Sequence, residues 1–148
     1  MESSIAKIRE LLFKAEAYWA FASEEHLSVQ TAEGKWSKKE ILGHLIDSAL
    51  NNLTRFTEIG YQPQPYAYRE YNQKELTGIN RNQYADKDEL FQLWLSLNKQ
   101  IIRVMESATA ERLALKISSP DPDITDLRSI MKDYPLHMQH HINQIISP

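Results

Sequence analysis

The stretch Trp36-Ser37-Lys38-Lys39-Glu40-Ile41-Leu42-Gly43-His44 contains the clearest local signal in the chain. Ser37 and Glu40 have the spacing of a capping box, in which each side chain accepts a hydrogen bond from the backbone amide of the other. Trp36 before the cap and Ile41 inside the helix can form a hydrophobic staple. The helix then continues to about Ile59 and ends at Gly60, with the apolar stripe Leu42, Leu45, Ile46, Ala49, Leu53 and Phe56.

Three more helices are predicted from similar signals. Ser4 can cap a first helix that runs from Ile5 to about Ala22 along a heptad-like apolar stripe. Asp86-Lys87-Asp88-Glu89 has the pattern of a second capping box and begins a helix that reaches about Met105. Thr125 or Asp126 can cap the last helix, which runs to about Ile146 and contains Pro135, where we expect a kink or a short break.

Four helices of about 20 residues, each with one apolar stripe, predict an all-α fold, a four-helix bundle formed by a single domain over residues 1–148. The connection 61–85 is long enough to cross the roughly 30 Å length of such a helix. The third helix can therefore run parallel to the second, which favours an up-down-down-up topology with a long crossover.

Composition limits the classes of function. The formal net charge of −3 provides no basic surface, so nucleic acid is not an expected partner. The chain contains no cysteine, which excludes disulfides, thiolate metal ligands and a cysteine nucleophile. No secretory signal is recognisable at the N-terminus and no apolar run approaches about 20 residues, so we expect no membrane partner and a cytoplasmic location.

Three of the five histidines lie close to the C-terminus, and two of them have the spacing of metal ligands. His137 and His141 are four residues apart and so share one face of a helix. His44 lies about 10 Å from the start of its helix, while His141 and His137 lie about 8 and 13 Å from the end of theirs. In the up-down-down-up bundle these helix ends lie at the same end, so the three histidines lie at similar heights along the bundle axis.

A helical wheel gives a less favourable picture. His44 shares its side of the helix with Asp47, Ser48, Asn51 and Arg55, and not with the apolar stripe. A shared site would then be a cleft at the margin of the bundle, not a buried core site. Taken alone, a pair of histidines four apart is more often a solvated or core-edge pair than a metal site.

Two motifs together resemble the DinB-like superfamily over essentially the whole chain. They are Gly34-Lys35-Trp36-Ser37-Lys38-Lys39-Glu40-Ile41-Leu42-Gly43-His44-Leu45-Ile46-Asp47-Ser48 and His137-x-x-His140-His141-x-x-Gln144-Ile145. The resemblance implies an up-down-down-up four-helix bundle with a divalent metal on His44, His137 and His141, and it implies a homodimer. The family includes bacillithiol and mycothiol transferases and relatives of maleylpyruvate isomerase. This chain departs from it at Ala49, where similar members often have glutamate, and at Pro135.

Three imidazoles on one ion leave coordination positions open for water or a thiol. Zinc and nickel suit imidazole best, with iron as a further candidate. We therefore expect an enzyme acting on a small molecule, a metal-dependent thiol S-transferase or hydrolase with a low-molecular-weight thiol as one candidate cosubstrate. The alternative is a non-catalytic bundle for binding or stress response, with a structural or vestigial metal site. Candidates for supporting the ligands or contacting substrate are Asp47, Asn51, Arg55, Tyr134, His140 and Gln144.

No residue stands out as a general acid or base, so the catalytic residues are unknown from sequence. Arg55 has two interpretations, because it can bind a carboxylate of the substrate or pair with Glu58 one turn further along the helix. His140 points about 60° away from His137 on the helical wheel, so we expect a neighbour of the site and not a ligand. Nothing in the sequence identifies the substrate.

Overall fold

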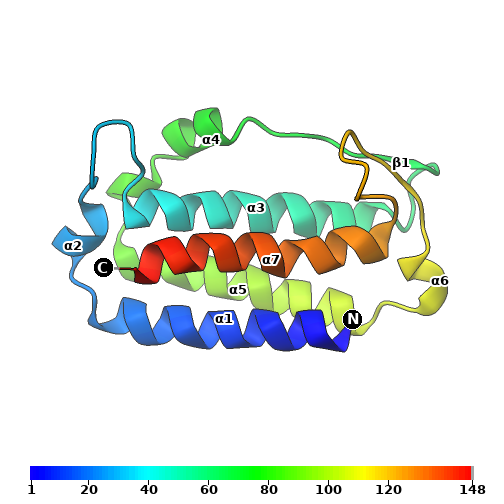
Figure 1. Ribbon diagram of the computed structural model, residues 1–148, viewed down its shortest axis with the longest axis horizontal. Coiled ribbons are helices and arrows are strands. Elements are labelled where there is room, and N and C mark those ends of the chain that lie inside the picture. The colour runs from blue at the N-terminus through cyan, green and yellow to red at the C-terminus, as the bar shows by residue number, and fades with distance from the viewer. Residues whose placement is uncertain (148) are drawn as a thin grey trace.

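Four long helices lie side by side and form the body of the molecule, as the computed structural model of residues 1–147 shows (Figure 1). They are α1 (Glu2–Phe21), α3 (Lys38–Glu58), α5 (Lys87–Glu106) and α7 (Leu127–Ile146). The connections contain the short elements α2 (Glu24–Ser28), β1 (Tyr66–Ala67), α4 (Gln73–Asn80), the 3-10 helix η1 (Asn82–Tyr84), α6 (Ala110–Leu113) and β2 (Ile117–Ser118).

The predicted up-down-down-up topology is confirmed. α1 and α7 run in one direction and α3 and α5 in the other (Figure 1). The chain leaves α3 at one end of the bundle and returns over its whole length through β1, α4 and η1 before α5 begins (Figure 1). β1 pairs in parallel with β2, Tyr66 opposite Ile117, and so ties this crossover to the connection before α7.

Local hydrogen bonds explain where the helices begin. The box predicted for α3 is present, since the Glu40 amide donates to Ser37 Oγ at 3.1 Å and the Ser37 amide donates to Glu40 Oε2 at 2.8 Å. Asp86 caps α5 by accepting from the amides of Asp88 and Glu89, a one-sided cap where a reciprocal box was expected. Of the two candidates for α7, Asp126 is the cap, in a reciprocal arrangement with Ser129.

Two expectations from the sequence, the cap of the first helix and the effect of Pro135, need correction. α1 begins at Glu2, so Ser4 is not its cap but a buried residue inside the helix. After α1 the chain forms the short helix α2, which Ser23 caps. Pro135 does not break α7, which is continuous from Leu127 to Ile146 with the proline on its buried side.

The core consists of the apolar stripes of the four long helices. Ile8, Trp19, Leu42, Trp94 and Met138 are among its side chains with 2% exposure or less. Within residues 1–147, no helix combines the length and the apolar character that crossing a membrane requires. α3 and α7 are antiparallel neighbours in this core, which places the start of α3 beside the end of α7 (Figure 1).

Candidate metal centre

His44, in the second turn of α3, meets His137 and His141, in the last three turns of α7. The ring centroids are 5.1 Å apart for His44 and His137, 4.6 Å for His44 and His141, and 4.7 Å for His137 and His141. One nitrogen from each ring lies within 4.8 Å of the other two. The antiparallel packing of α3 against α7 therefore brings together the three histidines that the sequence singled out.

The spacing of the ring nitrogens suits a metal ion. Two imidazole nitrogens bound to one tetrahedral zinc ion at about 2.0–2.1 Å are separated by about 3.3 Å. Nε2 of His44 and Nε2 of His137 are 3.2 Å apart. The donor set of three nitrogens, free of cysteine, matches zinc, nickel or iron better than the oxygen-seeking magnesium or calcium.

Contacts on the outer edge of two of the rings orient them. Gln144 Oε1 lies 2.8 Å from Nδ1 of His141. An amide oxygen can only accept, so Nδ1 of His141 carries the proton and its Nε2 has a free lone pair. Ser48 Oγ lies 3.4 Å from Nδ1 of His137 and can act in the same way. Nδ1 of His44 is buried, and no partner for it is present among residues 1–147.

Burial keeps the three imidazoles neutral. Burial, followed by the nearby His141 and His137, lowers the pKa of His44 to about 3. Burial, followed by His141 and His140, lowers the pKa of His137 to about 4. The pKa of His141 is also lowered, chiefly by burial. At neutral pH each ring can therefore offer a lone pair to a cation, which protonated histidines could not do.

The crossover covers the polar side of α3, which corrects the expectation of an open margin. His44 is fully buried, and Asp47, Ser48 and Arg55 are 2–5% exposed. η1 packs directly on α3, because a Cβ at Gly43 would lie 2.7 Å from Asn82 Cβ and closer still to its Nδ2. The helical wheel placed this stripe correctly away from the apolar core but could not show that the crossover buries it.

Sequence reasoning missed two side chains beside the histidines. The Trp36 ring lies 5.3 Å from the His44 ring, centroid to centroid, although its position suggested only a hydrophobic staple. Ser48, one turn after His44, contacts His137 instead. The i+4 spacing of Ser48 from His44 was a usable signal for a contact at the site.

Four of the six other predicted site residues lie beside His141 or form contacts of α3 outside the three histidines. Gln144 and His140 lie beside His141, with Gln144 Nε2 3.2 Å from His140 Nε2 and His140 exposed. Asp47 accepts at 2.7 Å from the amide of Asn80 and so connects α3 to α4, while burial raises the pKa of its carboxyl. Asn51 donates to the backbone carbonyl of Asp47, which leaves its amide engaged with its own helix.

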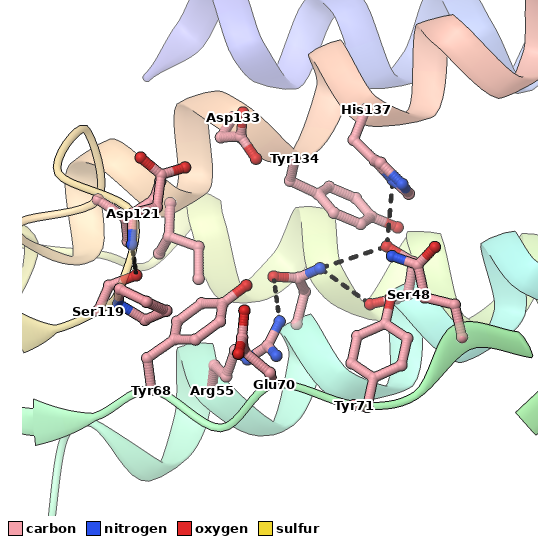
Figure 2. Close-up of a pocket in the computed structure, with 15 residues that line it drawn as sticks. Ser48, Arg55, Tyr68, Glu70, Tyr71, Ser119, Asp121, Asp133, Tyr134 and His137 are labelled. Carbon is pink, nitrogen blue, oxygen red and sulfur yellow. Dashed lines mark hydrogen bonds between the residues drawn. The ribbon is translucent and has the colours of Figure 1, made fainter. Parts of the chain in front are cut away.

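A cavity of about 370 Å³ adjoins His137, between α3, α7 and the crossover (Figure 2). Tyr134 lines it, and its hydroxyl donates to Asn98 at 2.7 Å in the buried core. Arg55 also lines it. Among residues 1–147 it forms no ion pair with Glu58, the second partner considered for it, and Glu58 instead accepts a hydrogen bond from Tyr66. A second hollow, of about 590 Å³, touches His141 and Trp36 on the other side of the histidines.

Comparisons with known proteins agree with this geometry. A sequence model described as the DinB superfamily matches residues 9–145. The Bacillus subtilis (strain 168) protein "Putative metal-dependent hydrolase YfiT" is 23% identical over 124 residues, which are 83% of this chain and 69% of that protein.

Two solved structures show the same fold. The structure of YfiT, described as a four-helix bundle of unusual topology, superposes with a TM-score of 0.84 at 22% identity, over 97% of this chain and 82% of YfiT. The mycothiol-dependent maleylpyruvate isomerase superposes with a TM-score of 0.75 at 11% identity, over 99% of this chain and 60% of the isomerase.

Proposed function

The chain belongs to the DinB superfamily, and on that premise we propose that it is a metal-dependent enzyme whose single divalent ion is held by His44, His137 and His141. The observation that carries the proposal is the convergence of three neutral imidazoles from two antiparallel helices, with two ring nitrogens at the separation of ligands on one ion. Zinc and nickel are the first candidates, and iron is the third.

The protein's own residues would prepare the site in three ways. Gln144 and Ser48 orient the rings of His141 and His137 through their outer nitrogens. Trp36 and the crossover close the site on the His44 side and keep solvent away from that ring. The cavity next to His137 leaves room for a substrate on the remaining side. A bound ion would supply a nucleophile by lowering the pKa of a coordinated water or thiol.

The reaction we propose is transfer or hydrolysis on a small molecule. Hydrolysis is supported by the name of YfiT, a relative identical at 23% of positions. A low-molecular-weight thiol as cosubstrate is suggested by the family and by the shared fold of an isomerase whose name includes mycothiol dependence. Both chemistries require the same feature, an open coordination position on the ion. A homodimer, a cytoplasmic location and a single domain over residues 1–148 remain predictions.

The open position separates an enzyme from a bundle with a purely structural metal, and cobalt(II) makes it visible. Cobalt(II) replaces zinc with the same ligands, and its absorption spectrum changes when a ligand is exchanged. We expect cobalt-loaded protein to show a new sulfur-to-cobalt absorption band when 2-mercaptoethanol is added, and a pH-dependent spectrum without thiol. A spectrum that responds to neither thiol nor pH would favour the non-catalytic alternative. The double variant His44→Ala, His141→Ala is the control for cobalt bound elsewhere.

A further inference from the structure

The cavity next to His137 separates opposite charges. Arg55 on α3 is 5% exposed and forms part of its inner wall. Asp121, before α7, and Asp133, on α7, are exposed and line the opposite side, whereas Glu70 of the crossover lies on the same side as Arg55 (Figure 2). The buried cation of Arg55 and the exposed carboxylates of Asp121 and Asp133 therefore face each other across the cavity.

Arg55 is buried without a carboxylate partner. Its guanidinium donates to the backbone carbonyl of Arg69 and lies 3.5 Å from Asn52 Oδ1. The aromatic rings of Tyr68 and Tyr71 lie 4.0 and 5.6 Å from it, centroid to guanidinium carbon. Among residues 1–147, no Asp or Glu oxygen lies within 4.0 Å of its nitrogens. A buried guanidinium with five donors is costly unless an anion shares the site, so this end of the cavity favours a carboxylate.

The two acids at the cavity opening, Asp121 and Asp133, also lack a partner of opposite charge. Neither Asp121 nor Asp133 forms an ion pair with a lysine or arginine of residues 1–147. Although Asp133 as a whole residue is exposed, partial desolvation of its carboxyl, and next the charge of Asp121, raise the pKa of that carboxyl. Two carboxylates that repel each other at a cavity opening are stabilised by a cation between them. An ammonium group is the cation that a small organic ligand brings.

Apolar and aromatic side chains form part of the cavity wall beside these charges. Ile124, Ile130 and the ring of Tyr134 line the cavity and can contact an aliphatic part of a ligand. A volume of about 370 Å³ lies within the range of small-molecule sites and holds an amino acid with a medium-sized side chain. A ligand with only one charge would leave either the guanidinium or the acids without a partner.

We infer that this cavity binds a zwitterionic, amino-acid-like ligand, with its carboxylate at Arg55 and its ammonium group at Asp121 and Asp133. The inference rests on the proposed function only in treating this ligand as the substrate delivered to the histidines. Binding itself requires no metal, so it is tested on protein stripped of metal, and a failure of the metal proposal would leave the result interpretable.

Three probes of nearly equal shape test the charges separately. They are L-leucine with both groups, 3-methylbutylamine without the carboxylate, and 4-methylpentanoate without the ammonium group. Calorimetric titration of the wild-type chain at neutral pH should show leucine binding at least about tenfold more tightly than either single-charge probe. Equal affinity for the three probes, a preference for a single-charge probe, or no detectable leucine binding at millimolar concentrations would overturn the inference.

Variants then locate each charge. Arg55→Gln should weaken leucine and 4-methylpentanoate about tenfold and leave 3-methylbutylamine unchanged, with Arg112→Gln, another arginine that donates to a backbone carbonyl, as the control. Asp121→Asn combined with Asp133→Asn should weaken leucine and 3-methylbutylamine only. Asp123→Asn is its control, a neighbouring exposed acid. Loss of all three probes in every variant would contradict the assignment, and the wild-type series stands even if Arg55→Gln fails to fold.

Discussion

Replacing Gly43 with alanine tests whether the crossover lies directly on α3 beside His44. A methyl group there would meet Asn82 Cβ at 2.7 Å and Cγ at 2.8 Å, well inside ordinary contact distance, and Cβ cannot move without the backbone of η1. Overpacking of this kind costs about 1–3 kcal/mol. Replacing a glycine in a helix interior with alanine stabilises the helix by about 1 kcal/mol. We therefore expect the free energy of unfolding to fall by about 0–2 kcal/mol.

Gly78→Ala is the matched control, because Gly78 lies inside α4 and an added Cβ meets no atom within 4 Å. Gly78→Ala improves helix propensity without any overpacking, so the free energy of unfolding should rise by about 1 kcal/mol. Urea unfolding measures the free energy of unfolding of both variants. The difference between them, about 1–3 kcal/mol, is the cost of overpacking at Gly43.

A second change, Asn82→Gly, removes the clashing atoms and should make Gly43→Ala favourable in that background. Equal stabilisation by Gly43→Ala and Gly78→Ala in the wild-type background would refute the packing of η1 on α3.

Two further predictions concern the core and the histidines. Tyr134→Phe leaves the buried Asn98 oxygen without its donor and should lower the unfolding free energy by about 1–3 kcal/mol, whereas Tyr84→Phe on the surface should change it by less than about 0.5 kcal/mol in urea unfolding. The folded-state pKa values of His44 and His137, about 3 and about 4, lie below the unfolded value of 6.5. Their stabilisation is therefore complete above pH 6.5, and stability of metal-free protein should fall between pH 6.5 and 4, by at most about 1.4 kcal/mol per pH unit for each histidine. His44→Ala should reduce this slope in unfolding curves recorded across the pH range, and an unchanged slope would contradict the pKa shift of His44.

The parts of the fold that local chemistry determines were predictable. Ser37 and Glu40 specify the start of α3 by their spacing, and the length of 61–85 indicated that α3 and α5 run parallel. The first helix was placed three residues late because Ser4 is a good capping residue by type, yet the chain is already helical at Glu2. Propensity is a weak guide at a helix end, where neighbouring packing decides.

Of the candidate site, only the three histidines were predictable from the sequence. Helix-end arithmetic placed His44, His137 and His141 at one level because rise per residue is nearly constant in a helix. The burial of Arg55 depends on Tyr68 and Tyr71 in the crossover, a segment whose path no periodicity reveals. For the same reason, the tie between Asp47 and Asn80 and the separation of charges in the cavity became visible only in three dimensions.

The most direct test of the central claim is the zinc stoichiometry of protein purified without a histidine tag and stripped of metal. Calorimetric titration with zinc at neutral pH should show one tight site per chain in the wild type and none in the double variant His44→Ala, His141→Ala. His26→Ala, which removes an exposed histidine next to Tyr18, should keep the site unchanged. One tight zinc site that survives in the double variant, or its absence from the wild type, would contradict a metal centre on these three histidines.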